Sequence, residues 1–286
     1  MVWIQSIILG VVQGLTEFLP VSSSGHLELV SKLMKGWSTA DFSGAAFSAI
    51  IQIGTEAAVI LYFWKDIVRI FLAWIKSFTK FSDGFSSFDK DAKMGWYIVF
   101  ATIPIVIAGV LFKDLIENEF RTLWATAAVL IIFGIILWIV DSVCPEEQHL
   151  EDMNTVKSVL FGLAQCLSLI PGVSRSGSTM TLGRLLKFSR AGAAKFSFYM
   201  AIPSVFGAAI LEIASVFKDG EATAAFGFPG WGPTTIATIV SFVVGYAVIK
   251  WFMSVISKIS YRPFAIYRVF IGIVIFALLG FGVIGA

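Results

Sequence analysis

The stretch "EFLPVSSSGH", residues 17–26, interrupts an apolar segment with a carboxylate, three serines and an imidazole. A second stretch, "PGVSRSGST" at residues 171–179, interrupts another apolar segment in a similar way. Proline breaks a helix, while Gly and Ser favour a turn. Each stretch therefore predicts a helix that stops, turns and restarts as a short helix. The four expected pieces are residues 2–19, 27–34, 157–170 and 180–186.

The rest of the chain has the composition of a membrane protein. Of the 286 residues, 57% are hydrophobic and only 14% are charged, whereas about 25% are charged in an ordinary soluble domain. The net charge of +2 is too small to indicate nucleic-acid binding, and no cleavable signal peptide is predicted. Six further apolar segments approach the ~20 residues that a helix needs to cross the hydrocarbon core. They are residues 47–64, 96–112, 123–140, 196–217, 234–254 and 264–285.

The two interrupted segments are copies of each other. At a constant offset of 152 residues, seven identities relate them. The pairs are Gly10 and Gly162, Gln13 and Gln165, Leu15 and Leu167, Val21 and Val173, Ser22 and Ser174, Ser24 and Ser176, and Gly25 and Gly177. Unpaired backbone cannot face lipid, so each interruption predicts a re-entrant helix-loop-helix hairpin buried in protein. We expect a single integral membrane domain over 1–286, with one repeat at about 1–140 and the other at about 155–286.

The loop charges predict the orientation. If the hairpins return to their own side, the loops 65–95, 142–195 and 250–263 share one side and hold fourteen Lys and Arg, against five on the other. By the positive-inside rule the richer side is cytoplasmic and both termini lie outside. The hairpins then enter from opposite sides, and their polar tips meet near the midplane. The predicted fold is thus all-α and polytopic, with six transmembrane helices and two re-entrant hairpins in an inverted-topology repeat.

The tips carry a set of groups suited to phosphate chemistry. Gln13 and Glu17 share a helix face. After them comes the first polar set: Ser22, Ser23, Ser24 and His26. The second tip supplies Ser174, Arg175, Ser176 and Thr179. A guanidinium, hydroxyls and helix N-termini predict an anion site, and a carboxylate can hold Mg²⁺ or Ca²⁺ or act as a base.

The nucleophile is open at this level, because both Ser23 and His26 can attack phosphorus. The competing interpretation is a structural ion pair between Glu17 and Arg175, with the serines as helix caps. Ionisable groups inside a membrane are costly and normally mark function, which favours an active site. We expect Glu56 to face the bundle interior and Arg268 to snorkel to a membrane interface. Residues 65–95 are expected to form a long loop, in which Lys90, Asp91 and Lys93 are solvated.

With "QGLTEFLPVSSSGH" and "PGVSRSGST" in this order, the chain strongly resembles the undecaprenyl pyrophosphate phosphatase family of the bacitracin-resistance type. The resemblance extends over essentially the whole chain, including "RPFAIYR" at 262–268. It implies a hydrolase that removes the terminal phosphate of undecaprenyl pyrophosphate and so recycles the lipid carrier for peptidoglycan synthesis. It also implies a divalent cation, Mg²⁺ or Ca²⁺, and a location in the bacterial inner membrane with the active site open toward the periplasm.

Carried over by position, the family's metal-binding motif falls on Gln13 and Glu17. Its catalytic residues fall on Glu17, Ser23, His26 and Arg175, with substrate-binding hydroxyls at Ser22, Ser24, Ser174, Ser176 and Thr179. Many members have Glu where this chain has Gln13. An amide can coordinate a cation but cannot act as a base, so the resemblance assigns the acid-base or main metal role to Glu17.

Two other classes of membrane protein share parts of this pattern. The type 2 phosphatidic acid phosphatases need a second histidine after their "SR" segment, whereas the only histidines here are His26 and His149, both before Arg175. Inverted repeats with broken helices also build secondary transporters, and a transporter of a phosphorylated lipid stays open. The expected partners are a polyprenyl pyrophosphate substrate and membrane lipid, with no nucleic acid. The oligomeric state is open, a homodimer included.

Overall fold

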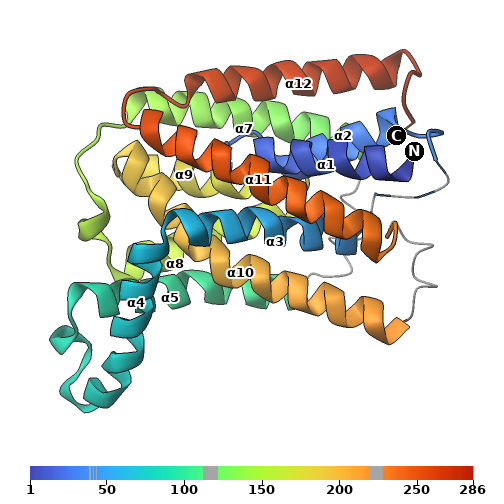
Figure 1. The fold of residues 1–286 in the computed structure, drawn as a ribbon. Helices are drawn as coiled ribbons and strands as arrows, with labels where there is room; N and C mark the ends of the chain where they lie inside the picture. Colours follow the sequence, from blue (N-terminus) through green and yellow to red (C-terminus); the bar gives the residue numbers. More distant parts are fainter. Residues whose placement is uncertain (39, 41, 43, 112–121, 220–227, 286) are drawn as a thin grey trace.

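The structure, a computed structural model, describes residues 1–38, 40, 42, 44–111, 122–219 and 228–285. These residues form a bundle of α-helices (Figure 1). The helices are α1 (Val2–Thr16), α2 (Ser23–Leu33), α3 (Ala45–Tyr62), α4 (Trp64–Ser77), α5 (Lys90–Leu111), α7 (Leu123–Val143), α8 (Thr155–Cys166), α9 (Arg175–Leu185), α10 (Arg190–Asp219), α11 (Trp231–Val255) and α12 (Arg262–Gly280).

Six of the described helices are long and apolar enough to cross a membrane: α3, α5, α7, α10, α11 and α12. This confirms the prediction of an all-α, multi-pass membrane protein. Helices α5 and α10 begin earlier than their apolar segments, because their first turns carry charged residues that a hydropathy pattern leaves out. The orientation in the membrane stays a prediction. Two basic residues used for it, Lys113 and Arg121, lie outside the described residues.

The chain breaks its helices where the two polar motifs predict. In both breaks the serine before the short helix has a positive φ, 76° at Ser22 and 70° at Ser174. Each of these hydroxyls accepts a hydrogen bond from a backbone N–H three residues later, that of Gly25 or Gly177. This is N-cap geometry, and it starts α2 and α9 several residues earlier than the apolar pattern predicts. The local structure thus repeats at the offset of 152 residues.

The first helix of each half packs on a helix of the other half. Helix α1 runs along α11 and α8 along α5, while α7 pairs with α12 (Figure 1). Glycine permits the close approach. A Cβ at Gly10 would lie 2.5 Å from the Ala237 carbonyl oxygen, and one at Gly162 would lie 2.4 Å from that of Ala101. This reciprocal packing, α1 on α11 and α8 on α5, is expected if the two halves are structurally equivalent. The re-entrant path and the inverted orientation stay predictions, because they refer to a membrane.

Residues 65–95 do not form only a long loop, so that prediction was wrong. Helix α4 follows α3 after a break at Phe63, and Figure 1 shows it turned away from the line of α3. It packs against α5, where Trp74 lies so close to Gly95 that a Cβ there would be 2.6 Å from the tryptophan Cβ. The charges of the segment suggested a loop, but its apolar residues recur at helical spacing and cover one face.

A buried ion-pair cluster joins α7, α9, α10 and α12. Asp141 of α7 accepts hydrogen bonds from Arg184 Nε of α9 at 3.2 Å and from Arg190 Nε of α10 at 2.7 Å. It also accepts one from the backbone N–H of Tyr261, just before α12, at 2.8 Å. Removing one partner of a buried pair is strongly destabilising, since it leaves an uncompensated charge. The cluster therefore anchors the C-terminal end of α9, whose first residue is Arg175.

Candidate active site

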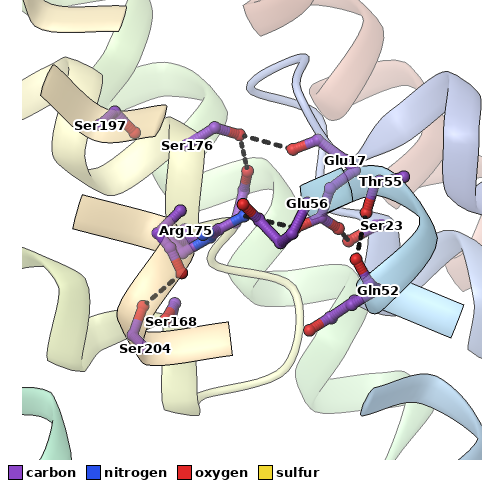
Figure 2. A network of polar contacts seen from close by, with 12 residues as sticks. Glu17, Ser23, Gln52, Thr55, Glu56, Ser168, Arg175, Ser176, Ser197 and Ser204 are labelled. Carbon is purple, nitrogen blue, oxygen red and sulfur yellow. Dashed lines mark hydrogen bonds and ion pairs between the residues drawn. The ribbon is translucent and has the colours of Figure 1, made fainter. Parts of the chain in front are cut away.

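Three ionisable side chains from distant parts of the sequence meet at one point. Arg175, the first residue of α9, donates through Nη2 to Glu17 Oε1 at 2.6 Å and to Glu56 Oε1 of α3 at 2.8 Å (Figure 2). The side chains of Glu17 and Glu56 are 4% and 0% exposed, and that of Arg175 is 13% exposed. Because ionisable groups are costly at membrane depth, three of them gathered here mark a candidate functional site.

The second carboxylate oxygen of Glu17 accepts hydrogen bonds from residues on both sides of the first helix break. Glu17 Oε2 accepts a hydrogen bond from Gln13 Nε2 of α1 at 2.7 Å and another from Ser23 Oγ of α2 at 2.7 Å. The hydroxyl hydrogen of Ser23 therefore points at a carboxylate. Glu17 is the group placed to take that proton if Ser23 attacks an electrophile.

Three buried polar atoms of this cluster have no partner among the described residues. They are the acceptors Gln13 Oε1 and Glu56 Oε2 and the donor Arg175 Nη1. Buried polar groups are almost always hydrogen-bonded, so these atoms are expected to meet a ligand. In addition, one guanidinium faces two carboxylates, which leaves one excess formal negative charge when both are ionised. The arrangement suits a cation beside an anion.

The donor set fits a hard divalent cation. Mg²⁺ and Ca²⁺ prefer carboxylate and amide oxygens, and Gln13 Oε1 and Glu56 Oε2 are unpaired. Both oxygens of Glu17 are already engaged, so this carboxylate would have to exchange one contact to reach a cation. Within the described residues no three His, Cys, Asp or Glu side chains gather as a metal site. The candidate ligands are therefore two carboxylates and an amide.

The serine hydroxyls of each motif form hydrogen bonds mainly with other residues of the same motif. The hydroxyls of Ser22 and Ser24 lie 3.2 Å apart, and those of Ser174 and Ser176 lie 3.1 Å apart. Ser22 and Ser174 also cap the short helices α2 and α9. Their hydroxyls thus have hydrogen-bond partners within the chain, and their predicted role in substrate binding stays a prediction.

The hydroxyls of Ser176 and Thr179 connect the second motif to neighbouring segments. Ser176 Oγ lies within hydrogen-bond distance of the Glu17 carbonyl, at 3.3 Å (Figure 2), and of the Leu19 carbonyl, at 3.0 Å, so it joins the second motif to the first. Thr179 Oγ1 donates to the Arg175 carbonyl at 2.7 Å and lies 2.6 Å from Ser197 Oγ of α10. These bonds hold the first turn of α9, and hence Arg175, against the first break and against α10.

His26 has its own partners, apart from the carboxylate cluster. Its Nδ1 lies 2.7 Å from the Ser22 carbonyl and its Nε2 lies 2.9 Å from the Tyr267 hydroxyl. A carbonyl can only accept, so Nδ1 carries the hydrogen and Nε2 of the neutral ring accepts from Tyr267. The structure thus pairs Ser23 with Glu17 and not with His26. Tyr267 lies on α12 next to Arg268, and the sequence carries no local signal of its contact with His26.

Arg268 does not snorkel to an interface, so that prediction was wrong. It is only 1% exposed, and it donates to the carbonyls of Pro20 and Gly172, one in each helix break. Long-range contact with both breaks leaves no local signal in the sequence. By contrast, Glu56 lies in the bundle interior as predicted, since it is fully buried.

Comparison with known proteins gives consistent relatives. The sequence profile of the family described as "Bacitracin resistance protein BacA" matches residues 6–274. A protein of Bifidobacterium adolescentis named "Undecaprenyl-diphosphatase" is 52% identical over 98% of this chain and 96% of its own. Proteins of the same name from Renibacterium salmoninarum and Micrococcus luteus are 50% and 46% identical. They match 100% of this chain, and 99% and 100% of their own lengths respectively.

Proposed function

The chain belongs to the bacitracin resistance protein BacA family, and on this premise we propose that it is an undecaprenyl-diphosphatase. The reaction removes the terminal phosphate of undecaprenyl pyrophosphate and yields undecaprenyl phosphate, the lipid carrier of cell-wall synthesis. Bacitracin resistance would accompany this activity. The observation that carries the proposal is the chain of contacts from Ser23 through Glu17 to Arg175, which joins a hydroxyl, a base and a phosphate-binding group.

In the mechanism we propose, Ser23 Oγ attacks the terminal phosphorus and Glu17 Oε2, 2.7 Å away, accepts its proton. The bond from phosphorus to the bridging oxygen breaks, and undecaprenyl phosphate leaves with the bonding electrons. Water then hydrolyses the phosphoserine, releasing inorganic phosphate and restoring the hydroxyl. The alternative in which His26 is the nucleophile requires its Nε2 to leave Tyr267 first. For this reason we favour Ser23.

Positioning and neutralisation of charge supply most of phosphoryl-transfer catalysis. The unpaired Nη1 of Arg175 is available for a phosphate oxygen. The N-terminal ends of α2 and α9 both begin at the helix breaks, and helix N-termini favour anions. In this proposal the hydroxyls of Ser22, Ser24, Ser174, Ser176 and Thr179 shape the walls of the phosphate site.

A divalent cation, Mg²⁺ or Ca²⁺, would be held by Glu17 and Gln13. Glu56, whose Oε2 is unpaired, is a third ligand candidate. When bound, the ion would neutralise phosphate charge and polarise the phosphoryl group. Because Gln13 is neutral, the second carboxylate of the set has to come from α3 and not from α1. This gives Glu56 a part in cation binding that the "QGLTE" motif alone does not predict.

We propose that the protein lies in the bacterial inner membrane with the site open toward the periplasm, as the family resemblance implies; the loop charges support an orientation with both termini outside. The prenyl tail would reach the site from the bilayer between the helices. Membrane lipid and the polyprenyl pyrophosphate are the proposed partners, and a homodimer is one state that an oligomer analysis should look for.

The test is phosphate release from undecaprenyl pyrophosphate by the detergent-purified full chain, with and without a chelator. We expect release that depends on a divalent cation and that Glu17→Ala abolishes. The matched control is Glu147→Ala, because the Glu147 side chain is 53% exposed and forms a surface ion pair with Lys187. Binding of the lipid without release under any divalent ion would refute the enzyme and favour a transporter.

A further inference from the structure

Arg268 of α12 holds the two helix breaks together. Its Nη1 donates to the Pro20 carbonyl at 3.3 Å and its Nη2 donates to the Gly172 carbonyl at 2.9 Å. Its guanidinium also lies against the first turn of α9, since a Cβ at Gly177 would be 2.6 Å from Nη1. One side chain therefore contacts both loops from which the catalytic groups project.

The charge of Arg268 is not neutralised by any carboxylate of the described residues. Within the described residues, its hydrogen bonds both go to backbone carbonyls and its Nε has no partner. An arginine stays protonated in proteins, and a buried charge without a counter-ion is strongly unfavourable. Since the side chain is only 1% exposed, water cannot compensate it as it would at the surface. A ligand of opposite charge would remove this imbalance.

Arg175 is in the opposite situation. Its Nη2 already serves two carboxylates, Glu17 and Glu56, so its charge is outweighed locally. An incoming pyrophosphate therefore finds only part of the positive charge it needs at Arg175. Arg268 lies at the same two helix breaks, beside the N-terminal ends of α2 and α9. No carboxylate of the described residues neutralises its positive charge.

We propose that Arg268 is a second phosphate-binding arginine, which bridges the two helix breaks and meets an oxygen of the substrate's pyrophosphate with its uncompensated charge. The inference rests on the proposed function for the identity of the substrate. The anion chemistry itself, two linked phosphate groups, can be tested without turnover. A purely structural bridge between the breaks is the alternative that the experiment must separate.

The experiment uses the detergent-purified full chain with Mg²⁺ and measures two quantities for each variant. The first is binding of methylene diphosphonate, a non-hydrolysable probe, and the second is the thermal unfolding midpoint. Arg268→Gln removes the charge, whereas Arg268→Lys keeps it. Arg262→Gln is the matched control, because Arg262 is an exposed arginine on the same helix that faces Trp138.

We expect Arg268→Gln to weaken diphosphonate binding about ten- to a hundredfold, the range for one hydrogen bond to a charged group. Arg268→Lys should bind nearer to the wild type, and Arg262→Gln should bind equally well. Wild-type binding by Arg268→Gln, or equal losses for Gln and Lys, would overturn the proposal in favour of a structural bridge. If wild type binds diphosphonate but releases no phosphate from the lipid, the proposed function fails while Arg268 is still tested.

A second variant covers the case in which Arg268→Gln does not fold. Gly177→Ala leaves the arginine in the chain, but its Cβ would lie 2.6 Å from Nη1 and push the guanidinium aside. The equivalent Gly25→Ala is the control, because its Cβ would meet a Thr126 methyl at 3.2 Å and no arginine. We expect weaker diphosphonate binding only for Gly177→Ala. Equal binding by the two variants would contradict the role of Arg268.

Discussion

Removing Arg175 should destabilise the protein by far more than the loss of one hydrogen bond, and Glu56→Gln should partly reverse the damage. Arg175→Ala leaves Glu17 and Glu56 close together without a guanidinium, and their side chains are only 4% and 0% exposed. Breaking a buried ion pair from one side costs about 3–5 kcal/mol. We expect a loss in the free energy of unfolding within this range.

Glu56→Gln alone should cost much less. The amide oxygen can still accept the hydrogen bond that Arg175 Nη2 now gives to Glu56 at 2.8 Å. Only the charge assistance is lost, a difference of about 1 kcal/mol. In the Arg175→Ala background, the same substitution removes one of two unpaired carboxylates. The double variant should then be more stable than Arg175→Ala by about 1–3 kcal/mol.

The assay is denaturant unfolding of the detergent-purified variants, followed by circular dichroism and by tryptophan fluorescence. The exposed pair Lys187 and Glu147 gives a control cycle, in which the coupling should be close to zero because exposed ion pairs contribute little. If the double variant Arg175→Ala with Glu56→Gln is destabilised by the sum of the two single changes, the account of the cluster as a charge-balanced triad is refuted.

Three further predictions address the nucleophile, the pH response and the orientation. Ser23→Ala should lower the rate of phosphate release at least about a thousandfold, and a larger loss for His26→Ala with Ser23→Ala active would reverse the assignment. Burial raises the pKa of Asp66, but hydrogen bonds and charges, led by Lys195, outweigh burial and lower the pKa below its ordinary 3.8. The stability that wild type has over Asp66→Asn should thus be full at pH 7 and shrink as the pH falls below about 3.8, and an advantage unchanged at pH 3 would contradict the assignment. Finally, Ser86→Cys in a chain without its native cysteines should react with an impermeant maleimide only after the inner membrane is opened, and labelling of intact spheroplasts would reverse the proposed orientation.

The amino-acid sequence determined the features that depend on local physics. Long apolar segments predict the six spanning helices, because the hydrocarbon core requires them. The proline, glycine and serine residues of the two motifs predict both helix breaks, and in the structure Ser22 and Ser174 cap the short helices that follow. The sequence also singled out Gln13, Glu17, Ser23 and Arg175, since polar groups are costly at that depth. The structure brings these four into one connected set of contacts.

Only the tertiary structure decided which of these groups meet. In the sequence, Arg175 is separated from Glu17 by 158 positions and from Glu56 by 119. No periodicity of the chain predicts a contact between residues at these separations. The pairing of Ser23 with Glu17 instead of His26, and the bridging role of Arg268, likewise follow from how the helices pack. Hydropathy tells which side chains are buried, whereas the choice of partner for a buried charge depends on three-dimensional proximity, which local sequence does not carry.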